Sequence, residues 1–158
     1  MTHGEARGAD RRGAATRDRG PMSAREWREL VRILAEGPGW VATRTDDMEP
    51  ARFSALVSAL AATDRHQRLP LVESLLRGEQ PVYSEPPSSE PPSTESVESW
   101  QEARAALCRR LEALGPEDWE TLTSHPTRGA LSLAEVVREW VDGELERRRR
   151  TARAVIER

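Results

Sequence analysis

The sequence predicts an all-α fold, a four-helix bundle with a long Pro/Ser-rich crossover between helices two and three. Apolar residues recur three and four positions apart in four separate segments, which is the spacing of one face of an α-helix. No segment shows the alternating pattern of a β-strand. Residues 79–93, EQPVYSEPPSSEPPS, hold two Pro-Pro pairs among serines and glutamates, so we expect an extended low-complexity connection there.

Helix one is expected to begin at Ser23, where helical periodicity starts. Its core face carries Trp27, Leu30, Val31 and Leu34. The tripeptide Gly37-Pro38-Gly39 follows, and it predicts a break or kink because proline lacks the N–H of a helical hydrogen bond. Pro38 would then be the first residue of a continuing segment that carries Trp40 and Val41.

Helix two is expected to follow Pro50. Its apolar face carries Phe53, Leu56, Val57, Leu60, Leu71, Leu75 and Leu76. Pro70 lies where it would kink this helix, and Gly78 marks its end, since glycine readily takes the left-handed conformation that closes a helix.

Helices three and four are predicted over about residues 94–114 and from Ser132 to the C-terminus. The face of helix three is Val97, Trp100, Leu107, Leu111 and Leu114. Gly115-Pro116 ends it, and a short turn with Trp119 and Leu122 and then a loop over residues 124–129 are expected. Ser132 and Glu135 have the spacing of a capping box, which predicts the start of helix four.

Length and composition indicate one domain. The chain has 158 residues, of which 37% are hydrophobic, so one core over residues 23–158 is expected, after a disordered tail at residues 1–22. The net charge is −3, and all 24 basic residues are arginine.

Cys108 is the one cysteine, so we expect no disulfide within the chain. The sequence shows neither a signal peptide nor a run of about 20 apolar residues. We therefore expect a cytoplasmic protein without a membrane span.

Three stretches carry a resemblance to a known family. They are FSALVSALAATD at 53–64, LLRGEQPVY at 75–83 and GPEDWETLTSHPTRGALSLAEVVREW at 115–140. Their order and spacing resemble the DinB-like (damage-inducible-type) superfamily of small helical proteins, which are regarded as metal-dependent and some of which are thiol transferases. The resemblance covers about residues 25–157 and implies a four-helix bundle, often assembled as a homodimer.

The resemblance also implies three metal-binding histidines, one on helix two and two on helix four, four residues apart. Here the corresponding positions are Ala61, Gly143 and Arg147, so the sequence departs from the metal site. Alanine and glycine have no ligand atom, and guanidinium is a permanent cation. Asp64 matches an acidic position of the family, and Glu144 replaces its usual aspartate. We therefore expect no metal and no cofactor, with Asp64, Glu144 and Arg147 as the polar residues of the former site.

The helix-four assignment depends on the register of its faces. The predicted core stripe runs through Leu133, Val136, Trp140, Gly143 and Arg147. Asp142 and Glu146 are also four residues apart and could bind a hard cation. We interpret them instead as part of a charged, solvated face, with Arg138 pairing with Asp142 and Glu146 pairing with Arg150.

The positions of the other reactive residues in the predicted helices and loops favour structural roles for them. His66 is expected at the surface, His125 in the loop before helix four, and Cys108 as a half-buried, unreactive thiol because no histidine base is recognisable near it. The tryptophans, Trp27, Trp40, Trp100, Trp119 and Trp140, are expected in the core or at its edge. Arg147 to Arg150 point around about 300° of a helix and make no single basic face, so nucleic-acid binding is not expected.

Two functions follow from these observations. The first is a binding or interaction protein that has lost the three-histidine metal site of the DinB-like family, with a homodimer and an unidentified small-molecule ligand as the expected partners. The alternative is a metal- or thiol-dependent transferase with a non-standard site.

Overall fold

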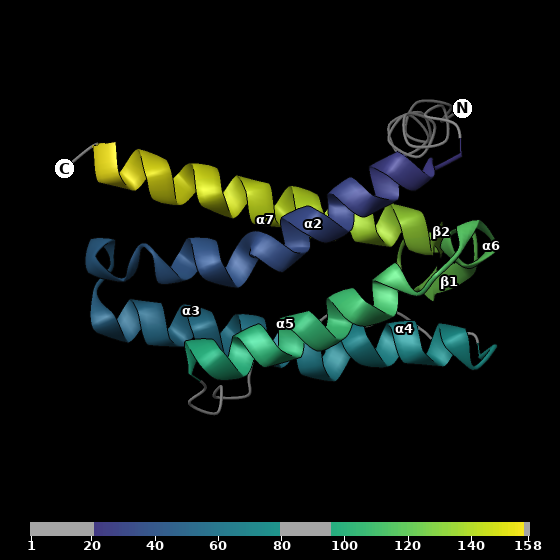
Figure 1. Cartoon of the computed structure of the whole chain (residues 1–158), viewed down its shortest axis with the longest axis horizontal. Helices are drawn as coiled ribbons and strands as arrows, with labels where there is room; N and C mark the ends of the chain where they lie inside the picture. Colours follow the sequence, from purple (N-terminus) through teal and green to yellow (C-terminus); the bar gives the residue numbers. More distant parts are fainter. Residues whose placement is uncertain (1–20, 80–95, 157–158) are drawn as a thin grey trace, which may run out of the picture.

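A computed structural model describes residues 21–79 and 96–156, and the protein is mostly helical with one small two-stranded sheet. The predicted tail at residues 1–22 and the crossover at 79–93 lie almost entirely outside the described residues. The long helices run along the longest axis of the molecule (Figure 1). Within the described part, no helix is long and apolar enough to cross a membrane.

Helix α2 spans Ala24–Ala42 without a break. Ser23 caps its start, since its side chain accepts a hydrogen bond of 3.1 Å from the backbone N–H of Glu26. Of the break or kink expected at Gly37-Pro38-Gly39, the break is absent, because Pro38 lies inside the helix and is buried. Thr45–Asp47 form a single 3-10 turn, η1, before the next helix.

The predicted second helix consists of α3 (Pro50–Thr63), a π-helical turn η2 (Asp64–Arg68) and α4 (Leu69–Leu76). The wide turn directly precedes Pro70, which cannot donate the hydrogen bond that would continue a regular α-helix. Gly78 ends α4 as predicted, with φ of +74°. The backbone N–H groups of Gly78 and Glu79 then bond to the carbonyls of Leu75 and Ser74, which closes the helix.

Helix α5 spans Val97–Glu112 and helix α7 spans Leu133–Ile156. The predicted capping box of α7 is confirmed. Ser132 N–H donates to Glu135 Oε2 at 2.9 Å, and Glu135 N–H donates to Ser132 Oγ at 3.2 Å.

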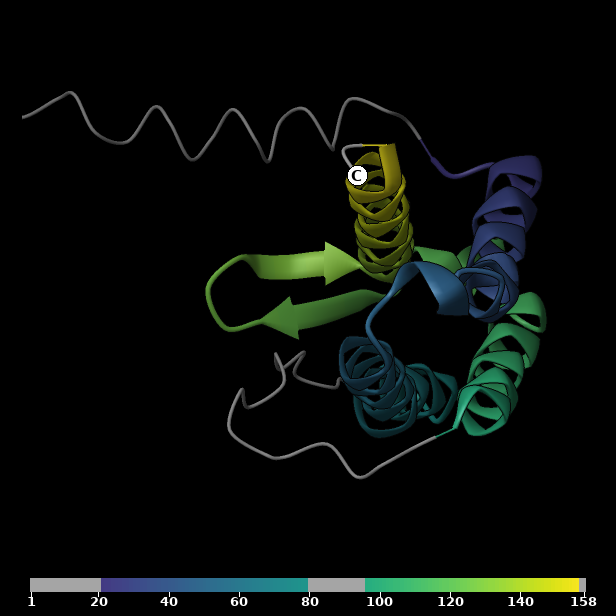
Figure 2. The same ribbon diagram turned by 90° about the vertical axis from the view of Figure 1, so that its left-hand side faces the viewer.

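The segment between α5 and α7 differs from the prediction, which allowed no strand. After the short helix α6 (Pro116–Trp119), strand β1 (Leu122–His125) pairs antiparallel with β2 (Gly129–Ser132). Gly129 has φ of +77°, which lets a three-residue loop close the hairpin. Seen end-on, this hairpin extends from the start of α7 to the side away from α2 and α5 (Figure 2).

The helices pack around one another with α2 and α5 at the centre of the contacts. Helix α2 packs against α5 and α7, and α5 also packs against α3, η2 and α4. The end-on view shows α7, α2, α5 and the α3–α4 segment in that order around the molecule (Figure 2).

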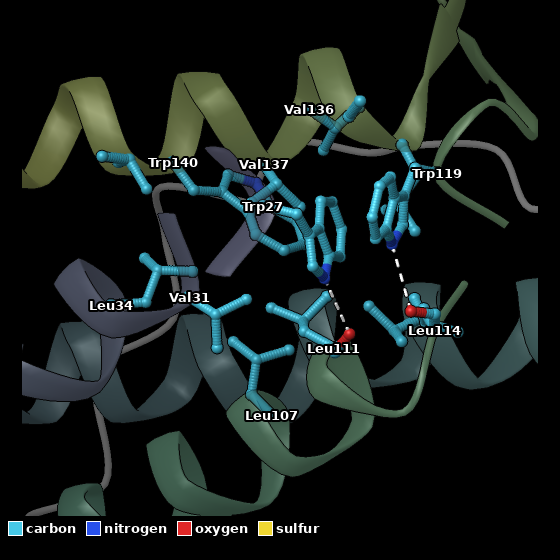
Figure 3. Packing of buried hydrophobic residues seen from close by; sticks show 14 of the residues in the cluster. Trp27, Val31, Leu34, Leu107, Leu111, Leu114, Trp119, Val136, Val137 and Trp140 are labelled. Carbon is cyan, nitrogen blue, oxygen red and sulfur yellow. Dashed lines mark hydrogen bonds between the residues drawn. The ribbon is translucent and has the colours of Figure 1, made fainter. Parts of the chain in front are cut away.

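The larger apolar cluster lies between α2, α5 and α7. Trp27 and Trp119 stack with their ring centroids 5.0 Å apart. Their indole N–H groups donate to the carbonyls of Leu111 at 3.0 Å and Leu114 at 3.2 Å (Figure 3). Aliphatic side chains of all three helices fill the space around them, among them Val31, Leu34, Leu107, Val136 and Val137.

A second, smaller apolar cluster contains Val41, Val57, Leu60, Ala61 and Trp100. In α5 and in the segment from α3 to α4, a buried charged residue separates the two clusters. In α5 Arg104 lies between Trp100 and Leu107, and in η2 Asp64 lies between Ala61 and Leu71. The core is therefore interrupted at one level by buried charge.

The inward face of α7 corrects the predicted core stripe. Gly143 is exposed, whereas Glu144 is only 3% exposed. At about 100° per residue, position 144 points within about 20° of Leu133, while position 143 points about 80° away. Gly143 therefore does not continue the stripe.

Gly143→Ala is expected to raise the free energy of unfolding by about 0.5–1 kcal/mol, because alanine is the better helix former. A Cβ at this position meets nothing within 4 Å. Urea denaturation of the two proteins measures the difference. A lower stability of the variant would show that position 143 is packed against something.

Candidate functional site

The buried charge at the centre of the protein is organised by Arg104 of α5, whose side chain is 1% exposed. Its Nε donates to Asp64 Oδ2 at 2.7 Å, and its Nη1 donates to the Leu34 carbonyl at 2.8 Å. Nη1 also donates to Glu144 Oε1. One guanidinium thus joins α2, η2 and α7 to α5, and we call Asp64, Arg104 and Glu144 the charged triad.

Asp64 is fully buried and accepts three hydrogen bonds. Besides Arg104, the Trp100 indole Nε1 donates to Oδ2 at 3.0 Å, and Arg68 Nη1 donates to Oδ1 at 3.2 Å. Asp64 is the first residue of the π-helical turn. A wide turn adds a residue to the helix, so it alters which side chains face inward after it.

Glu144 is held from two sides. Arg104 contacts Oε1, and Arg148, one turn further along α7, lies 3.5 Å from Oε2. Arg148 Nη2 also donates to the Ile33 carbonyl at 3.0 Å, so it ties α7 to α2. Each carboxylate oxygen of Glu144 therefore has a cationic partner.

The Gly-Pro-Gly tripeptide of α2 makes room for these contacts. Because Pro38 has no N–H, it cannot bond to the Leu34 carbonyl four residues earlier, and Arg104 donates to that carbonyl instead. A Cβ on Gly37 would lie 2.7 Å from Glu144 Oε2 and 2.9 Å from Oε1. The Gly-Pro-Gly tripeptide, which predicted a break or kink, therefore lies directly against the charged triad.

Charge and burial oppose each other in this cluster. Burial alone would lower the pKa of Arg104, but the carboxylates of Asp64 and Glu144 outweigh it and raise that pKa above its ordinary value. For Arg68 burial prevails, and its pKa is lowered despite the nearby Asp64. Arg68 also lies over the Trp140 ring, 5.1 Å from its centroid, so its side chain links η2 to α7.

The predicted site residues are only partly brought together. Asp64 and Glu144 are both buried and are joined by Arg104, a residue that the sequence analysis did not assign to the site. Ala61 is buried in the smaller apolar cluster, Gly143 is exposed, and Arg147 is half-buried. The inward pair four residues apart on α7 is Glu144 and Arg148, one residue after the positions that the resemblance gave.

The predicted charged face of α7 is largely present. Asp142 is exposed, and Glu146 pairs with Arg149 at 3.4 Å and Arg150 at 3.3 Å. The prediction that Arg138 pairs with Asp142 is wrong. Arg138 Nε instead donates to Glu26 Oε1 of α2 at 3.0 Å.

The surroundings of His66, His125 and Cys108 indicate structural roles for these residues. His66 is exposed, and His125 Nδ1 accepts the N–H groups of Thr127 at 3.2 Å and Arg128 at 3.1 Å within the hairpin. Cys108 is buried, and this burial raises the pKa of its thiol to about 11. A thiol with that pKa is a poor nucleophile at neutral pH.

Within residues 21–79 and 96–156, no three His, Cys, Asp or Glu side chains lie close enough together to hold a metal ion. The charged triad has two acids, but a guanidinium stands between them. No protein-family model, curated protein or solved structure matches the chain.

Sequence reasoning missed Arg104, although the sequence contains a signal for it. The predicted apolar face of α5 runs from Trp100 to Leu107, and position 104 falls between them at spacings of four and three. A charged residue at a core position requires a partner of opposite charge from another helix. Asp64 follows the buried Ala61 by three residues, and Glu144 follows the buried Val141 by three residues. Both acids therefore lie on the inward face of their helical segments.

Gly37→Ala is expected to lower the free energy of unfolding by about 1–3 kcal/mol, because its methyl group would press on a carboxylate that Arg104 and Arg148 hold in place. The matched control is Gly39→Ala in the same helix, whose Cβ meets nothing within 4 Å. Thermal and urea unfolding compare the two. Equal stabilities would mean that Glu144 is free to move aside.

Arg104→Met is expected to destabilise the protein by about 3–5 kcal/mol, because it leaves two buried carboxylates without their shared cation. Arg109→Met, which removes an exposed arginine from the same helix, should change stability by less than about 0.5 kcal/mol. Arg104→Lys keeps the positive charge but loses the forked N–H donors of the guanidinium, so its loss of stability should lie between those of the other two variants. Circular dichroism in urea measures all three, and a mild effect of Arg104→Met would contradict the role given to it.

Proposed function

We propose that the protein is a four-helix bundle of the DinB-like type in which the charged triad has replaced the metal centre, and that it acts as a binding or interaction protein. The observation that carries this proposal is the Arg104 guanidinium between Asp64 and Glu144 in the interior. The arginine links the same helical segments, helix two and helix four, from which the resemblance would draw metal ligands.

A fixed cation at this position opposes metal binding in two ways. Its charge repels a divalent ion, and its N–H groups already occupy the carboxylate oxygens that would be the ligands. To bind a metal, the two acids would have to release Arg104, which would leave a buried guanidinium without a carboxylate partner. The free energy for such an unpaired charge is several kcal/mol.

The high pKa of the buried Cys108 thiol also favours a binding role over a thiol-dependent reaction, since this thiol is not an activated nucleophile. A binding role requires only a stable scaffold and a surface. The homodimer that the resemblance implies belongs to this proposal, and light scattering on the purified protein measures its mass.

The metal content of the purified protein tests the proposal. After removal of metal with a chelator and equilibration with zinc, nickel or manganese, followed by dialysis, we expect well under one equivalent of bound metal and no change in thermal stability. The matched variant is Arg104→Met with Ala61→His, which removes the cation and adds one ligand.

Stoichiometric metal in the unmodified protein would overturn the proposal. So would turnover of an electrophile with a low-molecular-weight thiol that is lost in Asp64→Ala and Glu144→Ala when both variants remain folded. Metal binding by the double variant alone would support it, because the cation would then be what excludes the metal.

A further inference from the structure

A small pocket lies beside the charged triad, between α2, α5 and α7. Trp40, Val41 and Trp100 form its apolar walls, and Gly37 contributes backbone. Glu144, Arg147 and Arg148 supply its polar groups. Its volume is about 10 Å³, which is close to what one water-sized group requires. Only one atom of a ligand, such as a single oxygen, could therefore enter.

Arg147 is the cation of this pocket that lacks a carboxylate. In the described part of the chain its guanidinium has no hydrogen-bond or ion-pair partner, whereas Glu144 is already paired with Arg104 and Arg148. Arg147 is half-buried, and burial together with the repulsion from nearby arginines lowers its pKa. Such a group is stabilised by an anion.

The surroundings have an excess of positive charge. Around the triad, Arg68, Arg104, Arg147 and Arg148 face two buried acids, Asp64 and Glu144. A further arginine, Arg44, stacks on the ring of the lining residue Trp40, 3.8 Å from its centroid. These four guanidinium groups exceed the two buried carboxylates by two positive charges, and Arg147 is the one of the four without an ion pair to either acid.

We propose that this pocket receives one oxygen of an oxyanion, the carboxylate or phosphate group of a small ligand, with Arg147 as the principal contact of that group. The guanidinium fork matches either oxyanion with two parallel hydrogen bonds. Trp40 and Trp100 would flank the ligand next to its head. This inference rests on the proposed binding function and names the chemical class of its ligand.

The tryptophan indole N–H resonances test it in one NMR titration. Acetate and inorganic phosphate are added separately to the full-length protein at constant ionic strength, with chloride as the balancing anion. We expect saturable shifts of the Trp40 and Trp100 signals with a dissociation constant in the millimolar range. Trp27 and Trp119 lie in the larger apolar cluster and serve as internal controls that should not move.

Arg147→Gln should weaken the binding at least about tenfold, the factor expected when a charge-assisted hydrogen bond is lost. Arg153→Gln removes the same charge from an exposed position of α7 and should leave the binding unchanged. Whichever of acetate and phosphate binds more tightly identifies the head group.

The absence of saturable shifts with both anions up to about 100 mM would overturn the inference. Equal binding by Arg147→Gln and the unmodified protein would overturn it as well, since the anion would then bind elsewhere. Either result would leave the metal-free proposal intact, because that proposal is judged by metal content and not by anion binding.

Discussion

The Arg104 guanidinium is the interaction on which the arrangement of the helices depends. It contacts a carboxylate of η2, a carboxylate of α7 and a backbone carbonyl of α2, while its own chain belongs to α5. A buried charge is unfavourable unless each partner is in place, so the four segments are held in one relative position. An apolar cluster lies on either side of it.

Features that look unfavourable one at a time are explained by this contact. A proline inside α2 removes a hydrogen bond, but the carbonyl it frees accepts one from Arg104. A buried glycine beside it weakens the helix, but it admits the Glu144 carboxylate. The π-helical turn departs from regular geometry, and Asp64 at its start receives three donors. Helix regularity is lost where the polar contacts require it.

The sequence predicted what depends on neighbouring residues. The capping box at Ser132 and Glu135 and the helix end at Gly78 each involve a few consecutive positions, so their patterns were sufficient. The hairpin was missed because its buried side chains, Thr123 and His125, are polar and leave no apolar alternation. Asp64 and Glu144 were expected at the site, but their connection through Arg104 was missed, because each acid lies 40 residues from Arg104 and the pairing exists only after the helices pack. The choice of Gly143 over Glu144 on α7 was an error of one residue in helical register.

The close contact between Gly37 and Glu144 has a consequence for how the sequence can change over evolution. Because a methyl group at position 37 would collide with the carboxylate, and because the loss of Arg104 would remove a cationic partner from both buried acids, these positions are not independent. A substitution at one of them is tolerated only when another compensates for it. The chain can therefore exchange apolar residues on either side of the triad gradually, but it can replace the triad itself only in combined steps.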